Sequence, residues 1–522
     1  ESCSEGVFDK LLKDLDSRYL WSAGGWLEGM SDAEAVAQRD YTEAGKGRHI
    51  ITGIDTDGSG QIESDEKIAF TPTAFPAELA GLLSASDASE ASNIVEWVRG
   101  KDIPGLRSRQ LGGVTKRLGD IVYSTPTAVA RPSENLDLLY GSETYLEFFK
   151  RYRNRRQVIY TGANDGMLHA FNTGFYDTTT NSYKTEGGNG EAEHPLGAEL
   201  WAYVPQSLLP HLQWLKEAEY QHVYYVDGDV KTFEVNIFPD GGVHINGWGT
   251  ILVATMRLGG GDITFDPNSD PDGDADDDVT MRSAIVIFDV TDPESPPKLL
   301  AELTHENLGY TTSKPALYKV RPKNDDGTYD DANSLWYLMI GSGPAGDDGT
   351  SKQAALDMAV SNQEARVFRV NLKTMAWDTP YFTGQANSFV GDLTSMDWDG
   401  DYKDDATYFG TAGGTIASPT GALMRVRPEV AGSPVEVLLP NTGQPYTAAP
   451  RAIISDDGVF GGGPWVYVGT GRFLVADDIL STGQQSFYGI MEVSATELQS
   501  PTSITAFSRD ELVDTTEVRV FN

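Results

Sequence analysis

Residues 394–410 read Thr-Ser-Met-Asp-Trp-Asp-Gly-Asp-Tyr-Lys-Asp-Asp-Ala-Thr-Tyr-Phe-Gly, an acidic loop followed directly by an apolar run. Its carboxylates follow the spacing Asp-x-Asp-x-Asp-x-x-x-Asp. Calcium takes about six to eight oxygen ligands, and a tight loop that turns alternate side chains inward can supply several of them. The apolar run and the glycines after it are typical of a second strand and its end. The stretch therefore predicts a strand, an ion-binding turn and a second strand.

Five residues of this loop are the first candidate Ca²⁺ ligands. We expect Asp397, Asp399, Asp401 and Asp405 to bind through their carboxylates. Lys403 lies where such loops commonly offer a backbone carbonyl, so its side chain can point to solvent. The alternative is an acidic hairpin turn that binds no metal.

A second acidic loop, residues 55–66, fits the EF-hand calcium loop position by position. Gly60 takes the place of the sharp turn, and Ile62 fills the apolar eighth place. Gln61 would give its backbone carbonyl, and Glu66 would be the bidentate last ligand. The sequence contains no second EF-hand, so we expect a single structural site rather than a cooperative sensor. The ligands expected here are Asp55, Asp57, Ser59, Gln61, Glu63 and Glu66.

A third acidic stretch runs from Asp266 to Asp278 and repeats the first spacing. The repeat is formed by Asp270, Asp272, Asp274 and Asp278. Two prolines and the absence of flanking apolar residues favour a solvated insertion, with metal binding as the alternative.

The overall charge excludes some function classes. The 522 residues carry a net charge of −37, from 40 basic and 77 acidic side chains, which argues against nucleic acid as a partner. Such a charge suits a protein outside the cell or at its surface, and it suits calcium binding. Cys3 is the only cysteine, so no internal disulfide can form. No apolar stretch approaches about 18 residues, so we expect no transmembrane segment. The chain begins at Glu1 without Met or signal peptide, which predicts a processed or excised part of a longer protein.

Residues 1–118 are predicted to be a smaller, helical segment that carries the EF-hand-like loop. Apolar residues recur at helical spacing near the N-terminus, and Ser31 and Glu34 have capping-box spacing.

Residues 119–522 change to alternating, glycine-bounded strands that repeat. A Ser/Thr phrase opens several units, a hydrophobic strand follows, and a further strand closes each unit. The repeat predicts a modified β-propeller of about six to seven irregular blades, with a large β-sandwich as the alternative. The hydrophobic strands are expected at 158–162, 251–255, 337–343, 408–410 and 466–471. The closing strands are expected at 168–172, 284–290, 366–370, 422–426 and 487–493.

Residues 117–126 and 160–171 resemble the PilY/PilC family of type IV pilus biogenesis factors and tip adhesins, and the resemblance continues to the C-terminus. It is also carried by 199–205, 225–228 and 469–473. The resemblance implies a propeller in the C-terminal half of a larger secreted protein at the cell surface or pilus tip. It implies a calcium loop at residues 397–405, pilins or minor pilins as partners, and a host or surface receptor. Some members carry Arg-Gly-Asp; residues 99–102 read Arg-Gly-Lys-Asp, so integrin binding is not predicted.

Residues 164–170 are also similar to blades of quinoprotein dehydrogenases. Those enzymes commonly carry a vicinal cysteine pair, whereas this chain has only Cys3 and no haem-attachment motif. His169 is expected to be a packed histidine rather than a base, and the sequence has no hydrolase, zinc-protease or phosphate-loop motif. We predict a protein without enzymatic activity, with a quinoprotein-like propeller dehydrogenase as the alternative.

Overall fold

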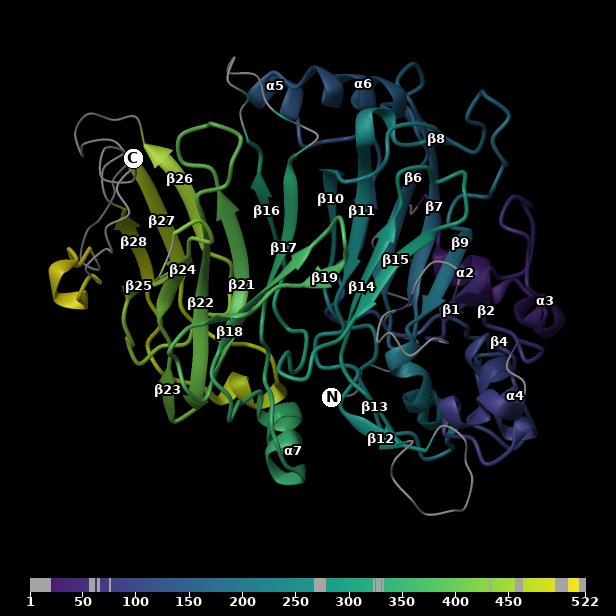
Figure 1. The fold of residues 1–522 in the computed structure, drawn as a ribbon. Coiled ribbons are helices and arrows are strands. Elements are labelled where there is room, and N and C mark those ends of the chain that lie inside the picture. The colour runs from purple at the N-terminus through teal and green to yellow at the C-terminus, as the bar shows by residue number, and fades with distance from the viewer. Residues whose placement is uncertain are drawn as a thin grey trace.

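The computed structural model describes residues 20–55, 62, 66–74, 77–266, 278–322, 324, 330, 333–430, 432, 434–455, 463–492 and 506–515. Within these residues, five open sheets of three or more strands follow one another along the chain (Figure 1). The strands are antiparallel to their neighbours except for one parallel pair in the first sheet. The prediction of a mainly β fold is confirmed.

The first sheet combines strands from the N-terminal segment with strands that follow residue 118. Its order is β2-β1-β9-β7-β6-β5, and β8 pairs with β7. β1 runs parallel to β9, so residues that we assigned to the helical segment lie in the first sheet. β1 is buried along its whole length, and burial beside β9 explains this placement. The strands are β1 (Ile50–Gly53), β2 (Lys67–Ala69), β5 (Thr127–Val129), β6 (Gln157–Gly162), β7 (Leu168–Asp177), β8 (Ser182–Lys184) and β9 (Glu199–Val204).

The other four large sheets are each built from consecutive chain segments. The second contains β10 (Val230–Asn236), β11 (Trp248–Ala254), β14 (Ile285–Asp289) and β15 (Lys298–Leu303). The third contains β16 (Ala316–Val320), β17 (Leu335–Gly341), β18 (Arg366–Asn371), β19 (Ala376–Trp377) and β20 (Tyr381–Phe382). The fourth contains β21 (Ser388–Met396), β22 (Ala406–Thr415), β23 (Ser418–Thr420), β24 (Leu423–Val426) and β25 (Val435–Leu439). The fifth contains β26 (Arg451–Ser455), β27 (Gly463–Gly469) and β28 (Phe487–Met491).

Short helices and two small hairpins lie around these sheets. α5 and α6 lie at the top of Figure 1, and α7 and the β12–β13 hairpin lie at the bottom. The predicted capping box is present, because Ser31 Oγ accepts from the Glu34 N–H at 3.2 Å and Glu34 accepts from the Ser31 N–H at 2.7 Å. The hairpins are β3 (Gln110–Leu111) with β4 (Val114–Thr115), and β12 (Ile263–Phe265) with β13 (Val279–Met281). The helices are α2 (Ala23–Glu28), α3 (Asp32–Val36), η1 (Ala77–Leu83), α4 (Ala88–Val98), α5 (Leu136–Tyr140), α6 (Glu143–Tyr152), η2 (Gln206–Lys216), η3 (Ile245–Gly247), α7 (Gly349–Met358), η4 (Ala476–Leu480) and η5 (Arg509–Glu511).

A small cavity of about 320 Å³ is lined by residues from all five large sheets or from the segments next to them. Most of the lining comes from the segments before β5, β10, β16 and β26 and from β21 itself, one strand of each sheet, which is the arrangement expected of blades around a propeller axis. Hydrogen bonds cross between blades here: Ser313 Oγ donates to the Gly391 carbonyl at 2.7 Å, and the Lys314 N–H donates to Asp392 at 2.9 Å. The lining includes Tyr123, Thr125, Gly228, Asp229, Thr312, Lys314, Gly391, Asp392, Thr447 and Ala448.

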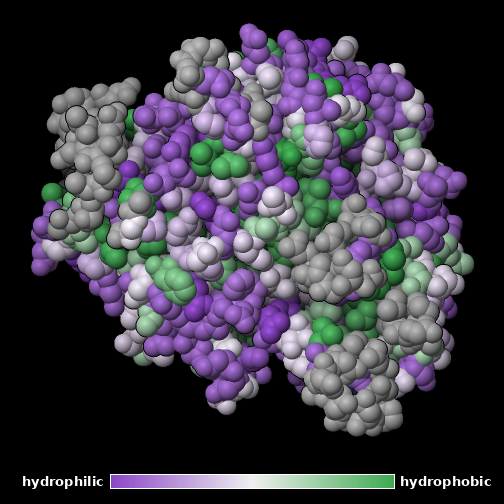
Figure 2. Space-filling model, viewed as in Figure 1, coloured by the Kyte–Doolittle hydropathy of each residue, from purple (hydrophilic) through white to green (hydrophobic). Residues whose placement is uncertain are grey.

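Each predicted hydrophobic strand lies in the same sheet as its predicted closing strand, and the first of these sheets also includes β1 and β2. The count of six to seven blades stays a prediction, because the described part of the chain contains five large sheets. The charged surface follows from the composition: Figure 2 shows hydrophilic side chains over most of the visible face.

Candidate metal centre

The loop between β21 and β22 is held in a tight turn by its own first carboxylate. Asp397 accepts hydrogen bonds from the backbone N–H groups of Gly400, Asp401 and Tyr402, at 2.7, 3.2 and 2.8 Å. Gly400 has φ +72°, in the left-handed region where a residue without Cβ is favoured. At the far end, the Asp405 N–H donates to the Met396 carbonyl at 2.8 Å, which closes the loop onto the paired strands.

The turn brings three of the predicted ligands together. Carboxylate oxygens of Asp397, Asp399 and Asp405 all lie within 4.8 Å of one another. Aspartate oxygens of this kind are the ligands that calcium prefers. The donor set therefore fits a hard divalent cation, with Asp397, Asp399 and Asp405 as the residues that would hold it.

The pKa of Asp405 is shifted in this cluster of carboxylates. Burial raises the pKa of Asp405 to about 7, and repulsion from Asp399, Asp397 and Asp401 acts in the same direction. The carboxylate is also hydrogen-bonded, because it accepts from the Trp398 N–H at 2.7 Å. A carboxylate with a raised pKa beside other carboxylates is stabilised in its charged form by a nearby cation.

The remaining two predicted ligands lie differently. The Asp401 carboxylate accepts the Lys403 N–H at 3.0 Å and is not part of the close group of three. The Lys403 ammonium lies 3.6 Å from Glu429 Oε2, so its partly exposed side chain is paired with a glutamate outside the loop. Metal binding by Asp401 and by the Lys403 carbonyl stays a prediction.

Three residues that support the loop were not singled out from the sequence. Trp398 is buried beneath it and donates from Nε1 to Tyr408 Oη at 2.8 Å. Tyr402 is fully buried, although its backbone is in the left-handed region at φ +69°. Asp404 is buried and accepts the Lys319 N–H at 2.6 Å, which ties the loop to the third sheet. The alternation of loop aspartates with aromatic residues was the available signal.

The EF-hand-like loop lies partly outside the described residues. Asp57, Ser59, Gln61 and Glu63 fall outside them, so the predicted ligand geometry stays a prediction. The flanking elements are the paired strands β1 and β2, whereas an EF-hand has flanking helices. Ile62 is buried in the core, as expected for the apolar eighth place. At the two ends of the loop, the Asp55 N–H donates to Gln206 at 2.8 Å and the Glu66 carbonyl accepts the Ile54 N–H at 3.1 Å.

Metal binding by the third acidic stretch stays a prediction. Asp270, Asp272 and Asp274 lie outside the described residues, as does Cys3. Asp266 and Asp278 lie at the inner ends of the β12–β13 hairpin.

His169 belongs to a buried ionic cluster rather than to an open site. Its Nδ1 lies 2.9 Å from Glu199 Oε1, and its Nε2 lies 3.1 Å from Asp165 Oδ1. Arg48 completes the cluster with a hydrogen bond from Nη2 to Glu199 Oε1 at 2.7 Å. Burial alone would lower the pKa of His169, but Asp165 and Glu199 outweigh it and raise the pKa to about 9. The prediction of a packed histidine is confirmed by its complete burial.

Comparison with known families finds a match for the part of the chain from β5 to α7. Residues 118–359 match the family described as the PilY1 beta-propeller domain. The resemblance to the PilY/PilC family is confirmed. The match covers the family motifs around Leu118 and Tyr160, and it ends before the acidic loop at 397–405.

Curated PilY relatives extend the similarity over most of the chain. A "Type IV pilus biogenesis factor PilY1 homolog" of Xylella fastidiosa is 26% identical over 436 residues, which is 78% of this chain and 28% of the relative. The "Type IV pilus biogenesis factor PilY1" of Pseudomonas aeruginosa strain UCBPP-PA14 is 26% identical over 445 residues, which is 80% of this chain and 32% of the relative. The chain thus spans less than a third of the length of these two relatives.

A solved PilY structure is also similar to the chain. The Pseudomonas aeruginosa PilY1 C-terminal domain matches with a TM-score of 0.45 and 20% identity, over 74% of this chain and 68% of that one.

Among the described helices, none has the length and apolar character needed to cross a bilayer.

Proposed function

We propose that this chain is a calcium-binding, non-enzymatic propeller region of a type IV pilus-associated protein. Its roles would be pilus biogenesis, control of extension and retraction, and surface adhesion. The observation that carries the proposal is the convergence of Asp397, Asp399 and Asp405 within 4.8 Å in a loop closed by paired strands.

Calcium is favoured by the donor chemistry of this loop. All three side chains offer hard oxygen ligands, without the imidazole or thiolate that softer metals select. The loop is also joined to the third sheet by Asp404 and to α5 by Tyr402, so a bound ion would change the order of more than its own turn.

A role in the pilus system is supported by the relatives, which are named as type IV pilus biogenesis factors. By extension, the partners of this chain would be pilins or minor pilins, together with a host or surface receptor. The location would be secreted, at the cell surface or pilus tip. Arg99, which begins the Arg-Gly-Lys-Asp stretch, is fully buried, so this stretch is a poor receptor motif.

The non-enzymatic role is favoured over a quinoprotein dehydrogenase by the same relatives and by the residues around His169. Asp165, His169 and Glu199 are buried and paired with one another. A base for alcohol oxidation must reach its substrate, and these side chains face the protein interior.

The test combines calorimetric calcium titration of the purified chain with complementation of a pilus-deficient strain. Asp397→Ala removes the carboxylate that organises the loop, and Asp477→Ala removes an exposed carboxylate elsewhere as a matched control. We expect Asp397→Ala to lose one calcium-binding event and to alter pilus number or twitching motility. Asp477→Ala should retain both properties.

Three outcomes would contradict the proposal in different ways. An unchanged calcium stoichiometry in Asp397→Ala would show that calcium does not bind at this loop. Lost calcium binding with normal pili and motility would make the site merely structural. Reduction of a dye by the purified protein with added quinone and alcohols would favour the dehydrogenase.

A further inference from the structure

A larger cavity, of about 720 Å³, lies at the end of the sheets opposite to the acidic loop. α7 and the β12–β13 hairpin mark this end in Figure 1. Its walls come from connections of several sheets: η2 after β9, the segment after β11, the β15–β16 connection, α7 after β17, and the start of η4. Such converging connections are a common place for ligand sites.

The backbone next to the cavity is tightly packed. A Cβ at Gly259 would lie 1.8 Å from the Tyr225 carbonyl oxygen, and one at Gly343 would lie 1.7 Å from the Tyr310 carbonyl oxygen. Neither glycine can be replaced without moving the backbone that shapes the cavity. The floor is apolar and buried at Leu258 and Ala345. The cavity is therefore preformed, which lowers the entropic cost of binding.

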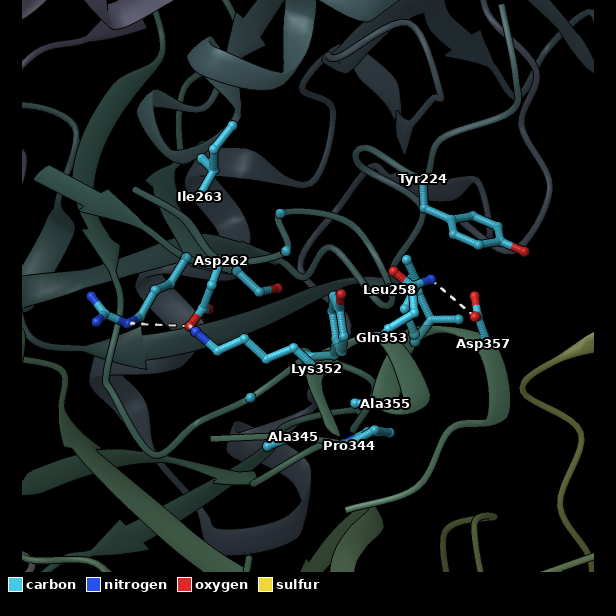
Figure 3. Close-up of a pocket in the computed structure, with 18 of the residues that line it drawn as sticks. Tyr224, Leu258, Asp262, Ile263, Pro344, Ala345, Lys352, Gln353, Ala355 and Asp357 are labelled. Carbon is cyan, nitrogen blue, oxygen red and sulfur yellow. Dashed lines mark hydrogen bonds and ion pairs between the residues drawn. The ribbon is translucent and has the colours of Figure 1, made fainter. Parts of the chain in front are cut away.

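One wall carries a polar cluster in which one carboxylate lies beside two cations (Figure 3). The Asp262 carboxylate lies 3.0 Å from the Lys352 ammonium and 4.0 Å from Arg282 Nε. An anion would have to displace Asp262 from its cations, and a cation would have to displace Lys352 or Arg282. The cluster thus offers donors and acceptors together. Two further carboxylates in the cavity lining, Glu306 and Asp357, bring the lining to three acidic against two basic side chains, so it has no strong preference for a charged ligand.

Aromatic rings form another part of the wall. Tyr224 lies on the other side of the cavity from the Asp262–Lys352 pair (Figure 3). Trp214 is 37% exposed at the cavity, and the ring of Tyr310 is half-buried. Burial raises the pKa of Tyr310 to about 12, with Asp262 and Asp357 acting in the same direction, so its hydroxyl is protonated and can donate.

We propose that this cavity binds a short neutral oligosaccharide. Sugar hydroxyls both donate and accept, so they can bond to Asp262 and to Lys352 without breaking the ion pair. The C–H faces of pyranose rings are apolar and pack on aromatic side chains such as Tyr224 and Trp214. The inference is independent of the calcium proposal, because it uses other residues at the opposite end of the sheets.

The test titrates the calcium-loaded chain with maltotriose, cellotriose, triacetylchitotriose and lactose, using calorimetry and ligand-observed NMR. A heparin tetrasaccharide and a glutamate-rich peptide serve as charged comparators. Lys352→Met keeps the side-chain stem and removes the ammonium, and Tyr224→Ala removes the ring. Lys150→Met on α6, an exposed lysine at the other end of the molecule, is the matched control.

We expect at least one neutral sugar to bind, with affinity lowered about tenfold or more by Lys352→Met and by Tyr224→Ala, and unchanged by Lys150→Met. Binding should persist when calcium is chelated from a chain that stays folded by circular dichroism. Failure of every neutral sugar at millimolar concentration would overturn the proposal. So would binding of a charged comparator alone, or sugar binding that both cavity variants retain.

Discussion

The ring of Tyr402, in the acidic loop of the fourth sheet, stacks on the ring of Tyr140 at the end of α5, with centroids 4.2 Å apart and planes at 22°. α5 belongs to the connection between β5 and β6 of the first sheet. The Arg321 guanidinium lies 4.0 Å from the Tyr402 centroid and adds a cation–π contact. The conformation of the acidic loop therefore depends on contacts with parts of the chain far from it in sequence.

Tyr402→Ala should lower the free energy of unfolding by about 3–5 kcal/mol, as for other buried aromatic side chains. The substitution removes the ring and keeps the left-handed backbone strain, whereas Tyr402→Phe keeps the stack and should cost little. Denaturant unfolding measures both variants. A double-mutant cycle with Tyr140→Ala should give a coupling of about 0.5–1.5 kcal/mol, and a coupling of zero would show that the stack is incidental.

Calcium should raise the melting temperature of the wild-type chain, because a ligand that binds only the native state stabilises it by mass action. At a hundredfold excess over the dissociation constant the gain is about 2.7 kcal/mol. Calorimetric melting with calcium and with chelator measures it. Asp405→Asn should reduce the calcium-dependent shift, while the exposed-site variant Asp477→Ala should keep it; an identical midpoint with and without calcium would contradict calcium binding.

The buried cluster around His169 predicts a loss of stability at alkaline pH. Asp165 and Glu199 raise the pKa of His169 to about 9 in the folded chain, against about 6.5 when unfolded. The stabilisation is therefore complete below about pH 6.5 and is lost as pH rises through about 9. Urea unfolding in saturating calcium between these values should show the fall in wild type and a flatter profile in His169→Gln. His222→Gln, at an exposed histidine, should follow the wild type.

Arg425 holds two carboxylates inside the fourth and fifth sheets. Its Nε lies 2.7 Å from Glu436 Oε2, and its Nη1 pairs with Glu492. Arg425→Met would leave both carboxylates buried without their cation, at a cost of about 3–5 kcal/mol. The triple variant with Glu436→Gln and Glu492→Gln should recover part of that loss in chemical denaturation. No recovery would show that the arginine acts through packing rather than charge.

Glu66→Ala tests the N-terminal loop separately from the propeller loop. If the EF-hand assignment is right, the variant loses its bidentate ligand, and calorimetric titration loses one calcium event and keeps the one that depends on Asp397. Unchanged stoichiometry would refute the EF-hand assignment.

The strands and repeats of the fold could be predicted because each strand is marked by its own local sequence, an apolar run bounded by glycines. Val466 to Gly469, for example, forms part of β27, and Arg366 to Val370 lies in β18. The parallel pairing of β1 with β9 could not be predicted, since alternation and turn residues specify a strand but not its neighbour. The spacing that identified the loop at 397–405 also placed three of its carboxylates together.

The loop sequence could not indicate which residues from other sheets contact the loop. Tyr140, Lys319 and Arg321 meet the loop only through the packing of separate sheets. The cavity lined by Asp262 and Lys352 was missed for the same reason, because its walls come from five separate connections. Asp262, Arg282 and Lys352 are far apart in the sequence, so no local charge cluster indicates the cavity.

The parallel pair of β1 and β9 has a mechanical consequence. Ile50 pairs with Ala202, Ile51 with Tyr203 and Thr52 with Val204, and the Arg39 guanidinium donates to the Leu200 carbonyl at 2.7 Å. Tension on the chain before Ile50, resisted by the chain after Val204, pulls these strands past each other along their length. Their hydrogen bonds are then loaded in shear and must fail together, whereas a hairpin pulled from its ends opens one bond at a time. The first blade is thus joined to the preceding chain by a connection suited to bearing load.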